Sequence, residues 1–208
     1  MSYFTATWSD WQNMTHHKRQ SFYAWRDELT LFGRIGFLMA SAAFIGLCAQ
    51  IKLVLPLTPV PLTLQTFAVA TVAVTSGGLW GTLATVVYIA LATLGLPWLA
   101  GSHGGWAVIT GSTGGYIVGF ILMATFIGRF TDKPTRCAWL PTWAALFAAD
   151  VFLILIPGTL WLWFNMEADG PLLETLGQAF TQGVVPFILA DIWKSGATSL
   201  IVAWLGRR

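Results

Sequence analysis

Six long hydrophobic runs, separated by short polar connections, dominate this chain of 208 residues. A run of about 20 apolar residues is long enough to cross the hydrocarbon core of a bilayer as an α-helix. We expect the six membrane helices at residues 35–51, 62–75, 79–96, 113–130, 141–164 and 176–205. The second is short for a full crossing, and the last is long enough to include a surface turn. The sequence therefore predicts an all-α, polytopic membrane protein, a bundle of six transmembrane helices.

The composition supports this class of protein. Hydrophobic residues make up 56% of the chain and charged residues 10%, whereas soluble domains carry about 25% charged residues. The net charge of +2 is too small to indicate a nucleic-acid partner. Cys48 and Cys137 do not belong to a Cys-x-x-Cys motif, so neither a disulfide framework nor a metal site is expected.

Two regions are expected: a polar, aromatic and basic N-terminal segment, 1–34, and a membrane domain, 35–208. The segment has no early apolar core followed by a small-residue cleavage site, so it does not resemble a signal peptide. Its mixture of tryptophans with lysines and arginines is compatible with an interfacial helix on the membrane surface. A loosely ordered tail fits the same composition.

Lysine and arginine predict the orientation, because they favour the cytoplasmic side of membrane helices. With six crossings, one side of the membrane holds Lys18, Arg19, Arg26, Arg34, Arg129, Lys133, Arg136, Arg207 and Arg208. The other side holds Lys52 together with Glu167, Asp169 and Glu174. Both termini are therefore predicted to be cytoplasmic.

Asp191 and Lys194 form the most informative pair of residues in the chain. They are the charged residues of the hydrophobic run 183–205, and three positions apart they share one face of a helix. Charges inside a membrane are costly, so such a pair indicates a functional site that grips a small molecule. The alternative is that the two side chains merely neutralise each other.

Two other features of the helices leave alternatives open. The first span has small residues at helical spacing, including Ala42 and Gly46, which suit either packing inside the chain or docking of a partner helix. Asp150 in the fifth span is either a proton relay or, as we favour, a carboxyl group near the interface that hydrogen-bonds a neighbouring helix.

The two connections on the outer side are unusual. Residues 55–65 contain Pro56, Pro59 and Pro61, which predict a stiff extended segment. Residues 96–106 and 110–116 are rich in glycine, which permits tight turns and close approach of the backbone to a small ligand. They contain neither a GxGxxG fingerprint nor a P-loop lysine. We expect both connections to close over one pocket with the outer half of the last span.

Several stretches resemble the BioY family, the biotin-binding S-components of energy-coupling factor (ECF) transporters. The matching stretches are Ala49-Gln50-Ile51, TPVPLTLQTFAV at 58–69, Gly95-Leu96-Pro97, GSTGGYIVGF at 111–120, and Pro186-Phe187 followed by Asp191-Ile192-Trp193-Lys194. The resemblance extends from about Arg34 to the C-terminus. Two departures are Ser112, where the family usually has proline, and Gly46, which pairs with Ala42 in the usual small-residue docking motif.

The resemblance implies biotin uptake across the inner membrane of a prokaryote. By this resemblance, the chain is expected to share the six-helix architecture of S-components. These proteins deliver substrate to a transmembrane coupling protein and two ATPase subunits. The resemblance also implies docking of this coupling protein at Ala42 and Gly46. The chain has no Walker lysine motif, so ATP hydrolysis is expected from the partners, and neither a cofactor nor an enzymatic activity of its own is expected.

The ureido ring of biotin suits the charged pair. Asp191 can accept a hydrogen bond from a ring N–H, and Lys194 can donate to the ring carbonyl. Further candidate contacts for the substrate are Gln65, Ser102, His103, Trp106, Gly111 and Tyr116, with Lys52 a more distant candidate for the valerate carboxylate. Trp98 and Trp161 are candidate apolar walls, although such residues are more often anchors at the membrane interface.

Two other classes of function were weighed. An enzyme would need a nucleophile with its base or a metal cluster, and no HExxH or GxSxG motif occurs. A secondary transporter driven by an ion gradient could use Asp150 with the Asp191–Lys194 pair. However, the chain lacks the internal inverted repeat that such folds often carry.

Overall fold

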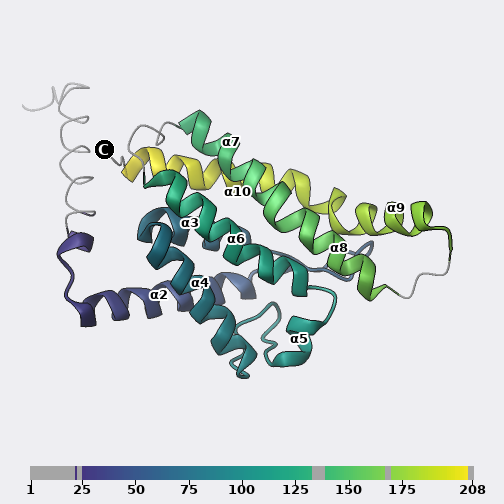
Figure 1. Ribbon diagram of the computed structural model, residues 1–208, viewed down its shortest axis with the longest axis horizontal. Helices are drawn as coiled ribbons and strands as arrows, with labels where there is room; N and C mark the ends of the chain where they lie inside the picture. The colour runs from purple at the N-terminus through teal and green to yellow at the C-terminus, as the bar shows by residue number, and fades with distance from the viewer. Residues whose placement is uncertain (1–21, 23–24, 133–138, 167–169, 206–208) are drawn as a thin grey trace, which may run out of the picture.

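The computed structural model describes residues 22, 25–132, 139–166 and 170–205. The helices pack together in one bundle (Figure 1). Two short strands lie between two of the helices, and a stretch of π-helix, η2, lies inside one long helical segment. The elements are α2 (Leu31–Gln50), β1 (Lys52–Leu53), β2 (Leu62–Thr63), α3 (Gln65–Ser76), α4 (Gly78–Thr93), α5 (Trp106–Thr110), α6 (Gly114–Thr131), α7 (Trp139–Ala149), η2 (Asp150–Leu155), α8 (Ile156–Asn165), α9 (Leu172–Gly183) and α10 (Val185–Leu205).

Each of the six predicted segments is helical, but they differ in length. In the described part of the chain, four helical segments are long and apolar enough to span a membrane: Leu31–Gln50, Gly114–Thr131, Trp139–Asn165 and Leu172–Leu205. The other two, α3 and α4, are apolar but shorter. The last segment divides into α9 and α10 at Val184, so the turn expected within this span is present.

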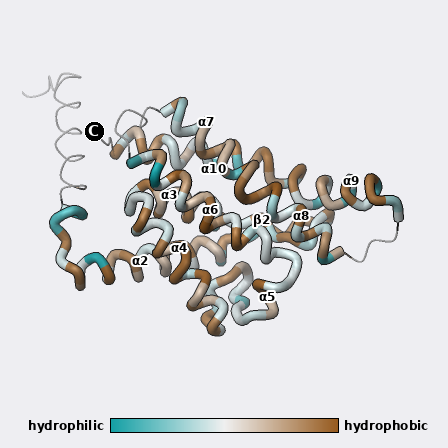
Figure 2. Tube along the Cα trace, viewed as in Figure 1, coloured by the Kyte–Doolittle hydropathy of each residue, from teal (hydrophilic) through white to brown (hydrophobic). Residues whose placement is uncertain are grey.

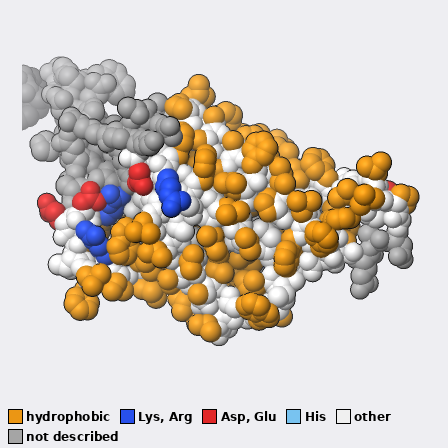
Figure 3. Space-filling view, viewed as in Figure 1, with side chains coloured by type: hydrophobic (Ala, Val, Ile, Leu, Met, Phe, Trp, Pro, Cys, Tyr) orange, Lys and Arg blue, Asp and Glu red, His pale blue; other side chains and the backbone are white. Residues whose placement is uncertain are grey.

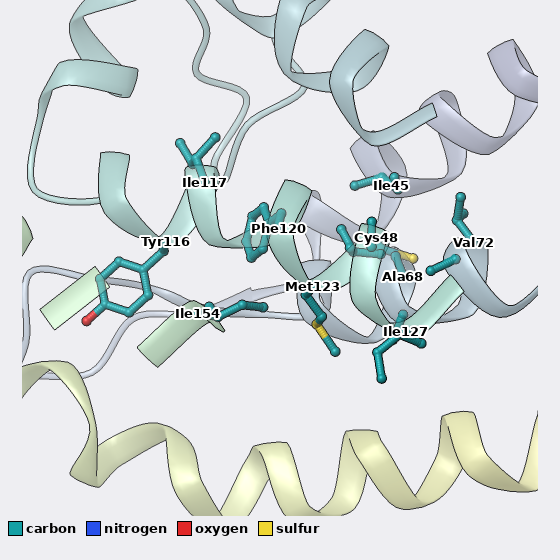
Figure 4. Packing of buried hydrophobic residues seen from close by; sticks show 14 of the residues in the cluster. Ile45, Cys48, Ala68, Val72, Tyr116, Ile117, Phe120, Met123, Ile127 and Ile154 are labelled. Atoms are coloured by element: carbon teal, nitrogen blue, oxygen red, sulfur yellow. The ribbon is translucent and has the colours of Figure 1, made fainter. Parts of the chain in front are cut away.

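α6 is the central helix of the bundle. It packs against α3, α4, η2 and α8, and 61% of its span is buried, compared with 28% for α2. Glycine permits this close packing, because a Cβ at Gly119 would lie 2.8 Å from the Cα of Ile154 in η2. The core around α6 is apolar and includes Phe120, Met123 and Ile127 (Figure 4).

The outer surface of the bundle is also hydrophobic. Exposed side chains include Phe32 and Leu47 on α2, Leu189 on α10 and Phe152 on η2. Figure 2 shows hydrophobic residues along most of the helices, and in Figure 3 hydrophobic side chains are spread over the described part of the visible face. An apolar surface around an apolar core is expected of a bundle that lies in lipid.

Charged side chains gather at one end of the described bundle, near the start of α2 (Figure 3). There the guanidinium carbon of Arg34 lies 5.9 Å from the centroid of the Trp80 ring, and Asp132 accepts a hydrogen bond from the Gly78 N–H at 3.0 Å. This end matches the side that the charge pattern predicts to be cytoplasmic. Eight of the charges used in that prediction lie outside the described residues, as do Cys137 and most of segment 1–34; the eight are Lys18, Arg19, Lys133, Arg136, Glu167, Asp169, Arg207 and Arg208.

Candidate substrate site

The proline-rich connection forms a hairpin between α2 and α3. β1 and β2 pair antiparallel, with Lys52 opposite Thr63 and Leu53 opposite Leu62. The segment between them is not helical, because its prolines cannot continue a helix, and it turns at Pro56 and Leu57. The Thr58 hydroxyl lies inside and accepts a hydrogen bond from the Val60 N–H at 3.1 Å. The connection therefore has a defined structure that faces the helices.

The second outer connection is attached to α2 through Gln50. The amide nitrogen of Gln50 donates to the Leu99 carbonyl at 3.2 Å, and its oxygen accepts from the Ser102 N–H at 2.9 Å and the Ser102 hydroxyl at 3.1 Å. Leu99 is buried and forms a bridge with His103. One side chain at the end of α2 thus positions the whole turn.

Gln65 attaches both connections to α4. Its amide nitrogen donates to the Tyr88 hydroxyl at 2.6 Å, and the Tyr88 hydroxyl donates to the Trp98 carbonyl at 3.2 Å. The Thr63 hydroxyl donates to the Gln65 side-chain oxygen at 2.8 Å. Since Gln65 and Tyr88 are buried, these hydrogen bonds are shielded from water and hold the two connections in register.

A cavity of about 370 Å³ lies between these connections and the helices. This volume is typical of a site for a small organic ligand. Its wall combines apolar side chains of α6, η2 and α10 with polar and charged side chains. The lining residues include Lys52, Thr58, Val60, Thr63, Gln65, Leu99, His103, Val108, Gly111, Tyr116, Ile117, Phe120, Ile154, Phe187, Asp191 and Lys194.

Asp191 and Lys194 meet at this cavity. The Lys194 Nζ donates to the Asp191 Oδ1 at 2.9 Å, and the two side chains are 6% and 2% exposed for lysine and aspartate, respectively. Buried ion pairs need further hydrogen bonds to offset their lost hydration. Because Lys194 makes this one side-chain hydrogen bond to the described residues, it retains N–H groups that can serve a ligand in the cavity.

Tyr116 supplies part of the apolar wall. Its hydroxyl donates to the Gly183 carbonyl at 2.9 Å, and its ring lies 6.1 Å from that of Phe187. Figure 4 shows Tyr116, Ile117 and Phe120 along α6, with Ile154 of η2 near Tyr116. The hydrogen bond to Gly183 therefore fixes the position of Tyr116, whose side chain lines the cavity.

The structure brings together six of the eight predicted substrate residues: Gln65, His103, Gly111, Tyr116, Asp191 and Lys194 all line the cavity. Ser102 and Trp106 do not line it. The Ser102 hydroxyl bonds to Gln50, and Trp106 is 68% exposed. Trp98 and Trp161 are also absent from the lining; Trp161 instead donates its Nε1–H to the Gly111 carbonyl at 2.8 Å. These residues shape the connections from outside.

Sequence reasoning did not single out several residues of the wall. The stretch 58–69, which resembles the BioY family, contains Thr58, Val60 and Thr63, but no substrate contact was predicted for them. No contact was predicted for Val108 or Ile154 either. Apolar residues such as Ile154 carry no signal that distinguishes a cavity wall from a core position. Thr58 and Val60 lie between the two short strands, so no strand period marks them either.

Ala42 and Gly46, the predicted docking pair, face the interior. Ala42 is 0% exposed, and a Cβ at Gly46 would lie 3.0 Å from the Trp98 ring. Neither is open to a partner, so the small residues here permit packing of Trp98 within the chain. Gly36 and Ala40 are exposed on another face of α2, and a Cβ at Gly36 would meet nothing within 4 Å.

Asp150 differs from the interpretation we favoured on sequence. The side chain is 1% exposed, and neither of its oxygens has a hydrogen-bond partner among the described residues. It therefore accepts no hydrogen bond from a donor on a neighbouring helix among the described residues, and it is buried rather than near an exposed surface. It begins the π-helical stretch η2 and lies close to Asp191 and Lys194.

The chain is similar to known biotin transport proteins. It is 37% identical over 147 residues to the biotin transporter BioY of Thermotoga maritima, which covers 71% of this chain and 81% of that protein. It is 38% identical over 128 residues to the probable biotin transporter BioY of Methanothermobacter thermautotrophicus, covering 60% of this chain and 80% of that one.

A solved structure and a family model agree with these relatives. The fold matches the crystal structure of the S-component for biotin from an ECF-type ABC transporter with a TM-score of 0.72 and 27% identity, covering 84% of this chain and 93% of the other. The model described as the BioY family matches residues 24–208. The chain therefore belongs to the BioY family.

Proposed function

We propose that this chain binds biotin in the cavity below the two outer connections and is the substrate-specific subunit of an ECF-type transporter. The observation that carries the proposal is the buried Asp191–Lys194 pair, which opens into a cavity of about 370 Å³. The names of the relatives and of the structural neighbour, which refer to biotin, support the same substrate.

The pair matches the ureido ring of biotin. Asp191 accepts a hydrogen bond from a ring N–H, and Lys194 donates to the ring carbonyl. Each such charge-assisted bond is worth about 1.5–3 kcal/mol in a site shielded from water. The fused ring and the aliphatic chain lie against Tyr116, Phe120 and Phe187, which line the cavity.

The carboxylate of biotin points toward the opposite end of the cavity. Lys52 and His103 line the wall there, and both are exposed. Lys52 supplies a positive charge at this mouth, and the glycine-rich turn supplies backbone N–H groups. In this proposal the Asp191–Lys194 pair lies at one end of the ligand and Lys52 at the other.

The test is binding of labelled biotin to the purified chain, with desthiobiotin, lipoate and thiamine as competitors. Desthiobiotin keeps the ureido ring and lipoate lacks it. We expect desthiobiotin to compete strongly and the other two weakly. Competition by lipoate without competition by desthiobiotin would contradict the proposed role of the pair.

The proposal places the chain in the cytoplasmic membrane of a prokaryote, with six crossings and both termini in the cytoplasm. The charged end of the bundle and the apolar outer surface support this orientation. α3 and α4, which are joined at Gly77, are two of the six crossings. Each of these helices is shorter than the full hydrocarbon thickness.

In this proposal a transmembrane coupling protein and two ATPase subunits supply the energy. The exposed face of α2 with Gly36 and Ala40 is the docking surface, because small residues allow a partner helix to approach closely. Ala40→Leu should reduce co-purification with the coupling protein while biotin still binds. Gly46→Leu, the internal comparison, should disrupt the packing of Trp98 and lower stability. Normal assembly of Ala40→Leu would exclude this surface.

A further inference from the structure

A second, very small cavity lies behind the charged pair. Its volume is about 10 Å³, and its wall is formed by Thr66, Phe67, Ala70, Met123, Asp150, Asp191, Lys194, Ser195 and Thr198. Thr66, Asp191 and Lys194 line both this cavity and the large one. The charged pair is therefore the partition between the substrate cavity and the space that holds Asp150.

No described residue donates a hydrogen bond to the carboxyl group of Asp150. It is 1% exposed, and both carboxyl oxygens lack a hydrogen-bond partner. The charged groups within interaction range are Asp191 and Lys194, both from α10. The other elements around the small cavity contribute no titratable side chain, since α3 supplies Thr66, Phe67 and Ala70, and α6 supplies Met123.

The charges of this cluster do not balance if both carboxyl groups are ionised. Two carboxylates and one ammonium leave a negative charge in the interior of the bundle, which is strongly unfavourable. A proton on one carboxyl group removes the excess. Since Lys194 already donates to Asp191, Asp150 is the group left to carry that proton and to need an acceptor.

We propose that Asp150 is a positioning residue for the substrate: it is protonated, donates a hydrogen bond to Asp191, and fixes the carboxylate that receives the ligand. This inference rests on the proposed role of Asp191 in biotin binding. Two donors then fix the Asp191 carboxylate: Asp150 on the side of the small cavity, and Lys194 on the same helix. The remaining acceptor positions of the carboxylate face the large cavity, where a ring N–H can occupy them.

The π-helix suits this arrangement. Asp150 is the first residue of η2, and π-helical turns are rare and occur frequently at functional sites. η2 packs against α6, where Gly119 admits its backbone.

Two substitutions of Asp150 distinguish a role as hydrogen-bond donor from a role in filling space. Asp150→Asn retains an N–H donor for Asp191, so we expect biotin affinity within about threefold of the parent. Asp150→Leu removes the donor, so we expect a loss of about tenfold or more, which corresponds to about 1.4 kcal/mol. Thr85→Val is the control, because the buried Thr85 hydroxyl bonds within its own helix to the Gly81 carbonyl at 2.9 Å and lines neither cavity.

The outcomes that overturn the proposal are distinct. Parental affinity in Asp150→Leu would show that Asp150 does not position Asp191. An equal loss in Asp150→Asn and Asp150→Leu would show that a donor at this position is not what matters. If Asp191→Asn binds biotin like the parent, the proposed role of Asp191 in the substrate site is wrong. Any effect of Asp150 substitutions would then be an effect on stability alone.

Infrared spectroscopy tests the proton directly and does not depend on biotin. The purified chain at neutral pH should show the carbonyl stretch of a protonated carboxylic acid, shifted in deuterated water and missing from Asp150→Asn. The same band in Asp150→Asn, or no band in the parent, would overturn the proposal even if Asp150→Leu does not fold.

Discussion

At the scale of single residues, the chain keeps a carboxylate and an ammonium 2.9 Å apart inside an apolar bundle. Burial of such a pair is not by itself a source of stability, because the lost hydration offsets the attraction. The arrangement is better explained by a ligand that needs an acceptor and a donor side by side. The cavity in front of the pair provides the room for such a ligand.

Removing one member of the pair should damage both folding and binding. Asp191→Asn leaves Lys194 without a counter-charge, and Lys194→Met does the same to Asp191, each at about 3–5 kcal/mol. We expect low yields of both single variants. The double variant should recover expression, since no lone charge of the pair remains, but should not recover binding of labelled biotin. Parental binding by the double variant would show that the pair is purely structural.

At the scale of elements, Gln50 illustrates how a helix end organises a connection that is not helical. Its side chain bonds to Gly46, Leu99 and Ser102. The cavity therefore depends on hydrogen bonds between connections and helices as well as on apolar packing. Loss of these bonds should loosen the cover of the site before it unfolds the bundle.

Gln50→Leu tests this cover. Each lost hydrogen bond contributes about 0.5–1.5 kcal/mol, so we expect biotin to dissociate about tenfold faster or more, with a small change in thermal stability. Gln178→Leu on the exposed side of α9 is the matched control and should leave dissociation unchanged. Dissociation kinetics of labelled biotin from the purified variants give the answer, and equal rates would argue against the role of Gln50.

Close helix packing depends on Gly119 in α6. Gly119→Ala places a methyl group against the backbone of η2, which should lower stability by about 1–3 kcal/mol. Gly177→Ala is the same substitution at a helical glycine of α9 with nothing within 4 Å. It should be neutral or stabilising by about 0.5–1 kcal/mol. Thermal unfolding in detergent compares the two, and equal effects would contradict the packing argument.

At the scale of the whole molecule, the bundle has a charged end and a ligand-binding end. Arg26 and Arg34 lie near the start of α2, and the substrate cavity opens beneath the connections at the opposite end of that helix. This polarity fits the proposed orientation, in which the substrate cavity faces one side of the membrane and the charged end faces the other.

Labelling of single cysteines tests this orientation. In a Cys48→Ala background, Ser102→Cys with Cys137 replaced by alanine should react with an impermeant reagent in intact cells, because Ser102 is exposed beside the outer cavity. The native Cys137, which follows α6 in the chain, should react after the membrane is permeabilised. Reaction of both from the same side would contradict six crossings.

The sequence by itself determined the class of protein, the six helical segments and the charged pair. These properties follow from local patterns: apolar run length for a membrane helix, and the spacing of Asp191 and Lys194 for a shared helix face. The prolines of 55–65 likewise predicted a connection that does not continue a helix, although it turns at Pro56 and Leu57 rather than staying extended. Each of these features depends on residues that are close together in the chain.

The tertiary structure decided which side chains meet across the bundle. Small residues occur on two faces of α2, and the packing of Trp98 determines that Gly46 lies inside while Gly36 stays outside. Ser102 and His103 are neighbours, yet Gln50 holds Ser102 outside the lining while His103 reaches it. Asp150 and Asp191 are 41 positions apart in the sequence. Their proximity follows from helix packing, which no local pattern specifies, because any apolar face can pack against several others.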